Sequence, residues 1–385
     1  MHPLESYSTQ SPPLSPPLRL EGRVQFHSGD AFYRSASRMT RDLGVLAAAV
    51  YRSQHNHLRV LDVMTGCGVR ALRYVVESKA DWVWANDGNL EHRPLVEANL
   101  AQSLSPHQYH LSFVSAREVF AQCQQQQQRF DWVDIDAFGS PAAHLAGGLA
   151  ATRMGGYLYL TATDGKSLAG QNSRRSLGQF NAYARYHPAK HEQGLRILIG
   201  LAMQQAQLQH LSLGPVLSFF CGKTYRVLLK LQPVGRHADQ DCGFLGYCHH
   251  CGQYTRVDWR SLPQAQCLAH PYERPLVISG PMWLGPLHHP PTLKAMQEQA
   301  LAWDWPRQVS LLDIMQAEAP LPPFYYPLAE IGRRGRMDIP NRDRLIQALQ
   351  NQGYAASRTS VAAQAIKSSA PLSEIVVAAR RVISG

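Results

Sequence analysis

Two carboxylates and an aromatic ring lie close together in the segment 130–141, whose sequence is FDWVDIDAFGSP. Its apolar start predicts a buried strand, which places Asp134 and Asp136 at the carboxyl end, where ligands of open α/β sheets bind. A carboxylate there can orient an exocyclic amine and stabilise the positive charge that develops when the nitrogen attacks an electrophile. We therefore assign Asp136 to the amine and Phe138 to stacking on its base. The alternatives are an acidic loop that caps a helix at Ser140-Pro141 and, for Asp134, a strand-end bond to backbone amides or an arginine.

A glycine-rich turn is the second chemical feature. The apolar strand pattern 58–64, which carries Asp62, ends in TGCGVRA and passes directly into a helical pattern. Glycines at such a turn, here Gly66 and Gly68, let the backbone pass close under a nucleotide-like ligand. The next strand pattern ends before Asp87, whose carboxylate can accept hydrogen bonds from both ribose hydroxyls. These residues predict a nucleoside site, and the alternative is a structural turn with an incidental acid.

The turn leaves two cofactor classes open. The spacing Gly66-x-Gly68-x-x-Ala71 satisfies the dinucleotide fingerprint, so a nicotinamide cofactor competes with S-adenosylmethionine. Arg70 at the start of the helix could meet the methionine carboxylate, whereas a pyrophosphate needs bare amide groups there. The sequence after the turn shows no redox pair and no hydride-transfer pair of a histidine and an acid, which disfavours an oxidoreductase.

Three of the seven cysteines cluster with a histidine. Cys248 and Cys251 are followed after fifteen residues by Cys267, and His270 completes the pattern C-x2-C-x15-C-x2-H. Two such pairs can close a tetrahedral Cys3His zinc site, whose four ligands leave no open position for catalysis. We therefore expect a structural Zn2+, with chance clustering of reduced cysteines as the alternative. The other four cysteines are scattered singly, which argues against a disulfide framework.

These residues need strands and helices to position them. Short apolar runs alternate with amphipathic stretches from about residue 58 to residue 164, an order typical of a parallel sheet with crossover helices on both faces. A helix over 190–209 and two further strands would complete this α/β domain near residue 235. Residues 236–291 are rich in His, Cys, Gly and Pro, and 323–385 show two amphipathic helical patterns, so we expect a second domain there.

Composition limits the class of protein. The chain of 385 residues is 45% hydrophobic and 17% charged, as folded proteins are, and its net charge of +10 favours a polyanionic partner. It has no apolar run of the roughly 18 residues that a bilayer span needs, and its start lacks a signal core. We therefore expect a cytoplasmic protein with no membrane partner. Residues 1–24 are proline-rich and are predicted to form a disordered leader.

Ordered motifs from about residue 21 to residue 372 resemble those of the tRNA guanine-26 N2-methyltransferases. These enzymes use S-adenosylmethionine to make N2-methyl- and N2,N2-dimethylguanosine. The motifs are Ala31-Phe32-Tyr33, Arg41-Asp42-Leu43, the turn through Tyr74, Ala85-Asn86-Asp87, the segment from Asp134 to Pro141, Thr161-Ala162-Thr163-Asp164, His191-Glu192, the zinc pairs, the segment from Gly280 to His288, the segment from Pro322 to Tyr326, and Ser357-Arg358-Thr359.

The resemblance implies a Rossmann-like class I methyltransferase domain over 25–235 and a C-terminal tRNA-binding domain over 236–385. Within the second domain it implies a zinc site at 248–270 and a winged-helix-like end at 323–385. It also implies that Phe32 joins Phe138 in flanking the guanine. The partner is then tRNA, and no obligate protein partner is inferred. We expect the second domain to present a basic surface with interleaved tyrosines, made of Arg333, Arg334, Arg336, Arg342, Arg344, Arg358, Lys367, Tyr325, Tyr326 and Tyr354.

By the same resemblance, the cofactor contacts fall on Arg41, Arg70, Asp87 and the pair Ser115-Ala116, beside the strand and turn residues Asp62, Gly66 and Gly68. Methyl transfer to the exocyclic N2 of guanine 26, with guanine 27 as a further position, is the implied reaction. The sequence leaves open whether one or two methyl groups are added.

Three positions depart from the family pattern. Ser115 replaces the usual aspartate, Ala137 replaces the proline of the Asp-Pro-Phe-Gly loop, and Arg34-Ser35 replaces Asn-Pro. His270 stands where a cysteine is commoner, which keeps the metal chemistry. The departures motivate an alternative function, a tRNA-binding protein whose methyltransferase centre is weakened or lost.

Overall fold

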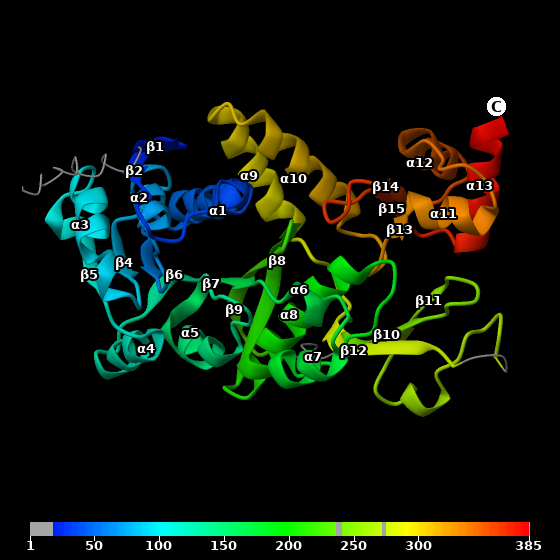
Figure 1. Cartoon of the computed structure of the whole chain (residues 1–385), viewed down its shortest axis with the longest axis horizontal. Coiled ribbons are helices and arrows are strands. Elements are labelled where there is room, and N and C mark those ends of the chain that lie inside the picture. The colour runs from blue at the N-terminus through cyan, green and yellow to red at the C-terminus, as the bar shows by residue number, and fades with distance from the viewer. Residues whose placement is uncertain (1–17, 236–240, 272–274, 385) are drawn as a thin grey trace, which may run out of the picture.

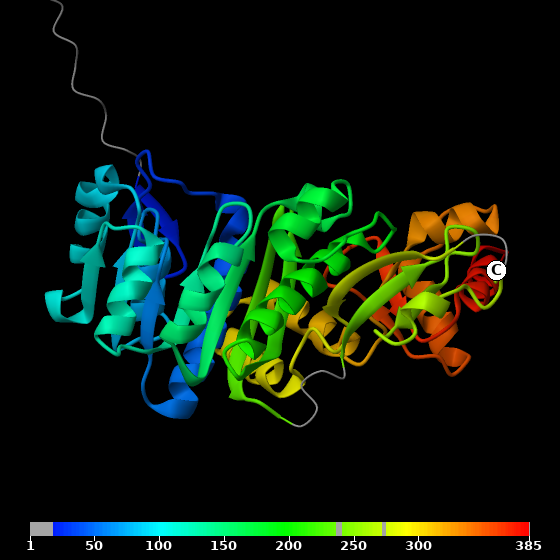
Figure 2. The ribbon, with the colours of Figure 1, turned by 90° about the horizontal axis from the view of Figure 1, so that it is seen from below.

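The computed structural model of the chain describes residues 18–235, 241–271 and 275–384. Figure 1 shows an elongated molecule with a large sheet and its helices at one end and the C-terminal helices at the other. In Figure 2 the strands of the large sheet lie side by side along the long axis, and the smaller sheets follow them. The glycine-rich turn and the predicted catalytic loop therefore belong to one end, and the cysteine cluster lies toward the other.

The large sheet has seven strands in the order β5-β4-β3-β6-β7-β9-β8. Strands β3 to β7 pair in parallel, whereas β9 pairs antiparallel with β7 and β8 antiparallel with β9. Their bounds are β3 (Arg59–Asp62), β4 (Trp82–Asn86), β5 (Tyr109–Ser112), β6 (Phe130–Ile135), β7 (Thr152–Ala162), β8 (Leu211–Cys221) and β9 (Thr224–Pro233). The predicted α/β class with a mostly parallel sheet is confirmed.

Helices cover both faces of this sheet, α1 to α3 on one face and α4, α5 and α8 on the other. Their bounds are α1 (Arg38–His55), α2 (Val69–Val76), α3 (Arg93–Ala101), α4 (Ala116–Gln125), α5 (Leu145–Ala151), α6 (Gly165–Leu168), α7 (Ser173–Phe180) and α8 (Lys190–Gln207). Successive strand residues point to opposite faces, so Trp132 of β6 lies in the core with α1 and Val133 in the core with α8. Both faces are buried, which explains the apolar strand sequences.

A β-hairpin precedes the large sheet. Its strands β1 (Leu18–Glu21) and β2 (Val24–His27) pair antiparallel. The prediction of a disordered leader over 1–24 is therefore wrong for residues 18–24, and residues 1–17 lie outside the described part of the chain. Val24 and Phe26 are buried in the core that contains α1 and α2. The hairpin is thus held to the domain by apolar packing that its short sequence did not reveal.

The described residues from 241 onward form two small sheets and five α-helices. Strands β10 (Cys242–Tyr247), β11 (Tyr254–Val257) and β12 (Val277–Trp283) form an antiparallel sheet in the order β11-β10-β12. The helices are α9 (Pro290–Ala302), α10 (Pro306–Glu318), α11 (Leu328–Gly335), α12 (Arg342–Asn351) and α13 (Leu372–Ser384), and β13 (Tyr326–Pro327), β14 (Ala356–Arg358) and β15 (Ala365–Ser368) form the last sheet. Residues 323–384 thus hold three helices, one more than the predicted two patterns.

Short 3-10 helices occupy Ser35–Ser37, Leu90–His92, Pro106–Gln108, Ala142–His144 and Leu262–Gln264. Among the described residues, no helix combines the length and the apolar character that crossing a bilayer requires.

The expected boundary at residue 235 does not separate the hydrophobic cores. Helix α9 lies beside α1 in Figure 1, and Leu293 of α9 and Leu312 of α10 are buried in the same core as α1. Gln308 of α10 also donates a hydrogen bond to the carboxylate of Asp42 on α1, at 2.6 Å. The two helices therefore attach the second half of the chain to the large sheet.

A buried carboxylate joins the hairpin to α1 and α2. Both oxygens of Glu21 accept hydrogen bonds from Arg41, at 2.7 and 2.5 Å, and Oε1 also accepts one from Arg73 at 2.9 Å. Burial alone would raise the pKa of Glu21, but the hydrogen bonds and charge of Arg41 and the charge of Arg73 lower it to about 2. Asp42 and Glu77 are the other partners of Arg73. In this buried network each of the three carboxylates and two guanidinium groups therefore has a partner of opposite charge.

Replacing Glu21 by Gln should destabilise the protein by about 3–5 kcal/mol, because the buried Arg41 loses its carboxylate partner and Arg73 loses one of its three. The pKa of Glu21 lies below the ordinary 4.5, so its contribution is present above pH 4.5 and lost as the pH falls toward 2. The difference in unfolding free energy between wild type and Glu21→Gln, measured with urea, should therefore shrink on acidification. Glu97→Gln, which breaks an exposed pair with Arg93, is the control and should cost at most about 1 kcal/mol. Equal effects of the two substitutions would contradict this account.

Candidate active site

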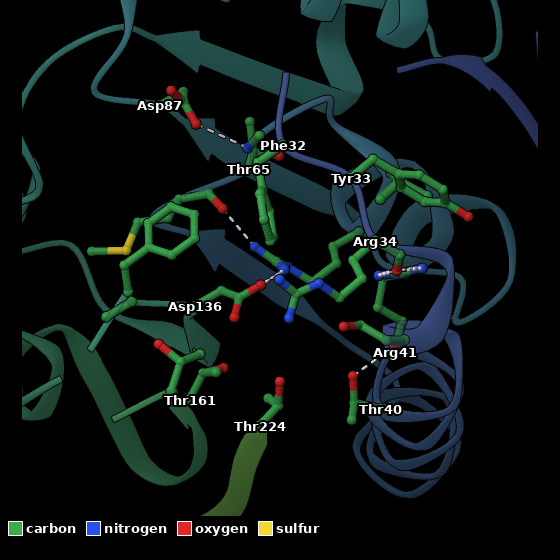
Figure 3. Close-up of a pocket in the computed structure, with 18 of the residues that line it drawn as sticks. Phe32, Tyr33, Arg34, Thr40, Arg41, Thr65, Asp87, Asp136, Thr161 and Thr224 are labelled. Carbon is green, nitrogen blue, oxygen red and sulfur yellow. Dashed lines mark hydrogen bonds and ion pairs between the residues drawn. The ribbon is translucent and has the colours of Figure 1, made fainter. Parts of the chain in front are cut away.

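A cavity of about 550 Å3 lies at the carboxyl end of the parallel strands. Figure 3 shows side chains converging on it from the residues that follow β4 and β6, from β7 and β9, and from the start of α1. Seven of the residues predicted from the sequence line it: Phe32, Arg41, Gly66, Arg70, Asp87, Asp136 and Phe138. The structure thus brings together residues that are up to about a hundred positions apart in the chain.

The glycine-rich turn forms one wall of the cavity. Gly66 has φ of +58°, and a Cβ atom on it would lie 3.2 Å from the backbone oxygen of Phe32. Gly68 has φ of +85° and begins α2, but it packs against Val96 and does not line the cavity. The amide of Gly66 donates to Asp87 Oδ2 at 2.9 Å, which joins the ends of β3 and β4. Positive φ at both positions favours glycine for the turn, and of the two only Gly66 lines the cavity.

A cluster of three carboxylates and two guanidinium groups lies at the floor of the cavity, which Asp136, Arg70 and Arg226 line while Asp62 and Asp134 are buried beneath them. Arg70 contacts Asp62 and Asp134 at 3.3 Å each and also pairs with Asp136. Arg226 contacts Asp134 at 3.1 Å and Asp136 at 2.9 Å. Asp62 and Asp134 are fully buried, whereas the side chain of Asp136 is 25% exposed. Asp136 is therefore the carboxylate of this cluster that a ligand can reach.

The two arginines decide the protonation state of Asp136. Its burial favours the neutral acid, but the charges of Arg226 and Arg70 outweigh this effect and hold its pKa well below the usual range. Burial raises the pKa of Asp62 to about 6, with the charge of Arg70 opposing and that of Asp134 adding to the rise. With all five groups ionised, the cluster carries a net charge of −1. Such a cluster suits a cationic ligand, and Asp136 is a hydrogen-bond acceptor there and a weak base.

Two phenylalanines stand at the mouth of the cavity. The ring of Phe32 meets that of Phe138 edge to face, with centroids 4.9 Å apart, and the rings are exposed although large and apolar, at 52% and 72% of the residue surface. The guanidinium of Arg34 lies 5.4 Å from the centroid of Phe32. Exposed aromatic faces beside a cation can stack on a planar base, and the two rings must part to admit one.

The cysteine cluster lies on the β10–β11–β12 side of the molecule. Ligand atoms of Cys248, Cys251, Cys267 and His270 all lie within 4.8 Å of one another. The sulfurs of Cys251 and Cys267 are 3.5 Å apart, and that of Cys267 is 3.7 Å from Nδ1 of His270. Ligands about 2.3 Å from a tetrahedral Zn2+ are separated by about 3.8 Å, so these distances fit a zinc ion. The tight turn needed here uses Gly252, whose amide donates to the carbonyl of Cys248 at 2.7 Å.

Several cavity residues were not assigned to the site by sequence reasoning, although Tyr33, Thr161 and Thr163 stand in the family motifs. Thr224 and Arg226 lie at the start of β9, Thr161 lies near the end of β7 and Thr163 follows it, and the others are Lys223, Tyr33 and Thr40. Because β9 runs antiparallel to β7, its first residues lie at the same edge as the last residues of β7. One sequence signal existed, a single arginine in the otherwise apolar run YRVLL. An arginine buried in a strand needs a carboxylate partner, but the sequence did not show which one.

Comparison with known proteins decides the family. The model of the N2,N2-dimethylguanosine tRNA methyltransferase family matches residues 18–380. The chain belongs to this family. A tRNA (guanine(26)-N(2))-dimethyltransferase of Thermococcus kodakarensis is 28% identical, with 93% of this chain and 95% of that protein aligned. A protein of the same description from Aeropyrum pernix is also 28% identical, with 93% and 91% aligned.

A solved family member shares the whole fold. The structure of Trm1 from Pyrococcus horikoshii in complex with S-adenosyl-L-methionine matches with a TM-score of 0.81 and 25% identity, over 94% of this chain and 99% of that one. The family fold therefore includes the second half of the chain as well as the large sheet.

Two residues that the family resemblance assigned to the cofactor lie elsewhere in this structure. Ser115 and Ala116 do not line the cavity. The hydroxyl of Ser115 donates to the carboxylate of Glu118 at 2.9 Å and accepts from the Glu118 amide at 3.3 Å, so it caps α4. Asp62 also lies outside the lining, because it is buried under Arg70 and Thr65. Arg41 does line the cavity, although its guanidinium is largely occupied by Glu21 and by the carbonyl of Arg34.

The basic surface expected in the C-terminal half is smaller than predicted. Lys367 is buried and donates to Glu192 at 2.8 Å, and Tyr325 and Tyr326 are also buried. Arg334 is partly buried and pairs with Glu330. Ile366 of β15 and Tyr326 of β13 belong to the same buried core as α8, α11 and α13, which places the neighbouring Lys367 and Tyr325 in the interior. The exposed cations of the set are Arg333, Arg336, Arg344 and Arg358.

Proposed function

We propose that this protein transfers methyl groups from S-adenosylmethionine to the exocyclic N2 of guanine 26 in tRNA, with guanine 27 as a further target. The observation that carries this proposal is the Asp136 carboxylate, which is ionised by Arg70 and Arg226 and faces a cavity with two aromatic rings at its mouth. The two relatives described as tRNA (guanine(26)-N(2))-dimethyltransferases support guanine as the target base and position 26 as its place in tRNA. The number of methyl groups is one or two.

The charge of the cluster around Asp136 supports S-adenosylmethionine over a dinucleotide. Bound there, this cofactor supplies an electrophilic methyl group and carries a net positive charge, which the cluster with a net charge of −1 favours. A pyrophosphate would bring two negative charges beside Asp136, whereas the methionine part brings one carboxylate together with an ammonium and a sulfonium. The relative from Pyrococcus horikoshii was solved with S-adenosyl-L-methionine. We assign Asp87 to the ribose hydroxyls, Arg70 to the methionine carboxylate, and Arg41 and Gly66 to the remaining contacts.

In this proposal Asp136 orients the amine. Its carboxylate accepts an N–H of guanine N2, which turns the nitrogen lone pair toward the methyl donor and stabilises the charge that develops on nitrogen. Because its pKa is far below neutrality, Asp136 does not hold the proton after transfer, and the proton passes to water. One N–H remains after a first transfer, so the same contact can serve a second. Phe32 and Phe138 hold the base on its two faces.

The test is incubation of purified protein with radiolabelled S-adenosylmethionine and unmodified tRNA transcripts, followed by nucleoside analysis. We expect label in N2-methylguanosine or N2,N2-dimethylguanosine. A transcript with inosine at position 26 is the matched control, because inosine differs from guanosine by the missing N2 amine. Inosine at 26 and at 27 in separate transcripts locates the target.

Label that persists with both positions replaced contradicts the proposed target. Protein that binds tRNA and S-adenosylhomocysteine but transfers no methyl group establishes the alternative, a binding protein with a lost centre.

Replacing Asp136 by Ala should lower kcat by about a hundredfold or more, because the contact is made mainly when charge develops on nitrogen. The affinities for tRNA and S-adenosylhomocysteine should change little, as measured by filter binding and calorimetry. Asp136→Asn keeps one acceptor oxygen and the shape, so its loss should be smaller. In wild type, kcat should show no ionisation of Asp136 above about pH 5. Loss of both binding activities in parallel with kcat would assign Asp136 a structural role.

We further propose that Cys248, Cys251, Cys267 and His270 hold a structural Zn2+. The fit of their spacing to a tetrahedral ion supports this assignment. Metal analysis should find one zinc per chain, and Cys251→Ser should remove it, whereas Cys221→Ser at the end of β8 should not. Because the cluster lies outside the cavity, removal of zinc should weaken tRNA binding and leave S-adenosylhomocysteine binding intact. Purified wild type without zinc would overturn the assignment.

A further inference from the structure

We propose that the segment between β7 and α8 is a second docking surface for RNA, beside the catalytic cavity and distinct from the exposed arginines of residues 333–358. This inference rests on the proposed function and names the part of the methyltransferase half that grips the nucleotides around the target base. The surface is made of Lys166, Arg174, Tyr183, Arg185, Tyr186 and Lys190, and we call it the 166–190 surface.

The 166–190 surface adjoins the catalytic loop. The segment starts at Asp164, directly after Thr163 on the wall of the cavity, and the amide of Gly139 donates to Thr163 Oγ1 at 2.7 Å. Ser140 Oγ donates to the carbonyl of Gln179 on α7 at 3.0 Å. The loop that carries Asp136 and Phe138 is therefore bonded to this segment at two points. A nucleotide beside a base held in the cavity would lie on it.

The backbone of the segment is held rigidly. Tyr183 exchanges two backbone hydrogen bonds with Gly280, at 2.8 and 3.2 Å, and the amide of Arg185 donates to Ser279 Oγ at 2.9 Å. Ser173 Oγ donates to the carbonyl of Ala184 at 2.6 Å. Residues alternate between buried and exposed along this extended stretch, with Ala182 and Ala184 inside. The side chains between them are consequently presented outward without the entropy cost of ordering a loop.

Two tyrosines and two cations are paired on the outward face. Tyr183 and Tyr186 are exposed to 41% and 51% although they are large aromatic residues. Arg185 lies 5.8 Å from the centroid of the Tyr183 ring, and Lys190 lies 5.1 Å from that of Tyr186. Aromatic faces that stack on bases, beside cations that meet phosphates, form the surface that single-stranded nucleic acid requires.

Charge and position favour RNA over a protein partner. Lys166, Arg174 and Arg185 are exposed, and the nearby Asp164 is already paired with Arg175 at 2.9 Å. The surface is therefore positive with no exposed acid among residues 164–190. In Figures 1 and 2, α6 and α7 lie between the large sheet and the β10–β12 sheet. A tRNA that reaches from the cavity to the C-terminal half passes over them.

The experiment measures tRNA affinity by filter binding over a series of salt concentrations for Arg174→Ala, Arg185→Ala, Tyr186→Ala and Tyr186→Phe. Each arginine substitution should lower the slope of log Kd against log salt by about 1. Tyr186→Ala should weaken binding at least fivefold, about 1 kcal/mol of stacking, and Tyr186→Phe should restore it. Arg129→Ala is the matched control. This exposed arginine precedes β6 at the amino-terminal end of the strands, opposite the cavity, and its substitution should change neither the salt slope nor the affinity.

S-adenosylhomocysteine affinity, which should stay at the wild-type value in every variant, reports an intact cavity. If the wild type binds and methylates tRNA while all four variants behave like Arg129→Ala, the 166–190 surface is not a docking surface and the proposed function stands. If the wild type itself binds no tRNA, the proposed function fails and this inference with it. Equal losses for Tyr186→Ala and Tyr186→Phe would also overturn the stacking role.

Discussion

The structure depends on keeping two arginines and three aspartates together out of water. Arg70 comes from the first turn of α2, Arg226 from β9, and the aspartates from the ends of β3 and β6. An unpaired charge at such depth would cost several kcal/mol, so each strand end must reach the same point for the cluster to form. The antiparallel entry of β9 is what delivers the second guanidinium. Without it, Asp134 and Asp136 would share one cation and Asp136 would hold its charge less firmly.

The same kind of compensation joins the two halves of the chain. Lys367 of β15 pairs with Glu192 of α8 at 2.8 Å, and Arg196 on the same helix donates to carbonyls of Trp283 and Gly285. Glu318 of α10 accepts from Ser360 and pairs with His288, and these bonds outweigh its burial and lower its pKa to about 2. Buried charges have strict partners, whereas apolar side chains can slide. The position of the C-terminal half relative to the cavity is thereby fixed.

Local patterns in the sequence predicted much of the site, because they depend on neighbours in the chain. The glycine turn, the acid after β4, the Asp136 loop and the cysteine pairs each carry their spacing within about twenty residues. Residues whose roles depend on distant partners in the chain were not predicted from the sequence. Glu21 in a presumed leader, Arg226 in an apolar strand and Lys367 in a presumed basic surface are all buried ions whose counter-charges lie far along the chain. Ser115 caps α4 and does not line the cavity, which the sequence could not show, since a helix cap and a ligand contact use the same residue type.

The fixed connection between the large sheet and the C-terminal half, called the joint below, affects which base of the tRNA becomes the target. If the C-terminal half and the 166–190 surface both grip tRNA, the nucleotide that enters the cavity is set by the distance between these surfaces and Asp136. That distance is fixed by α9 and α10 against α1 and by the buried charges around Glu192 and Glu318. In the proposed mechanism Asp136 contacts only the amine, which every guanine carries, so it would not distinguish one guanine from the next. Selection between neighbouring guanines would therefore be determined by the joint and the docking surfaces, and not by the chemistry of the cavity.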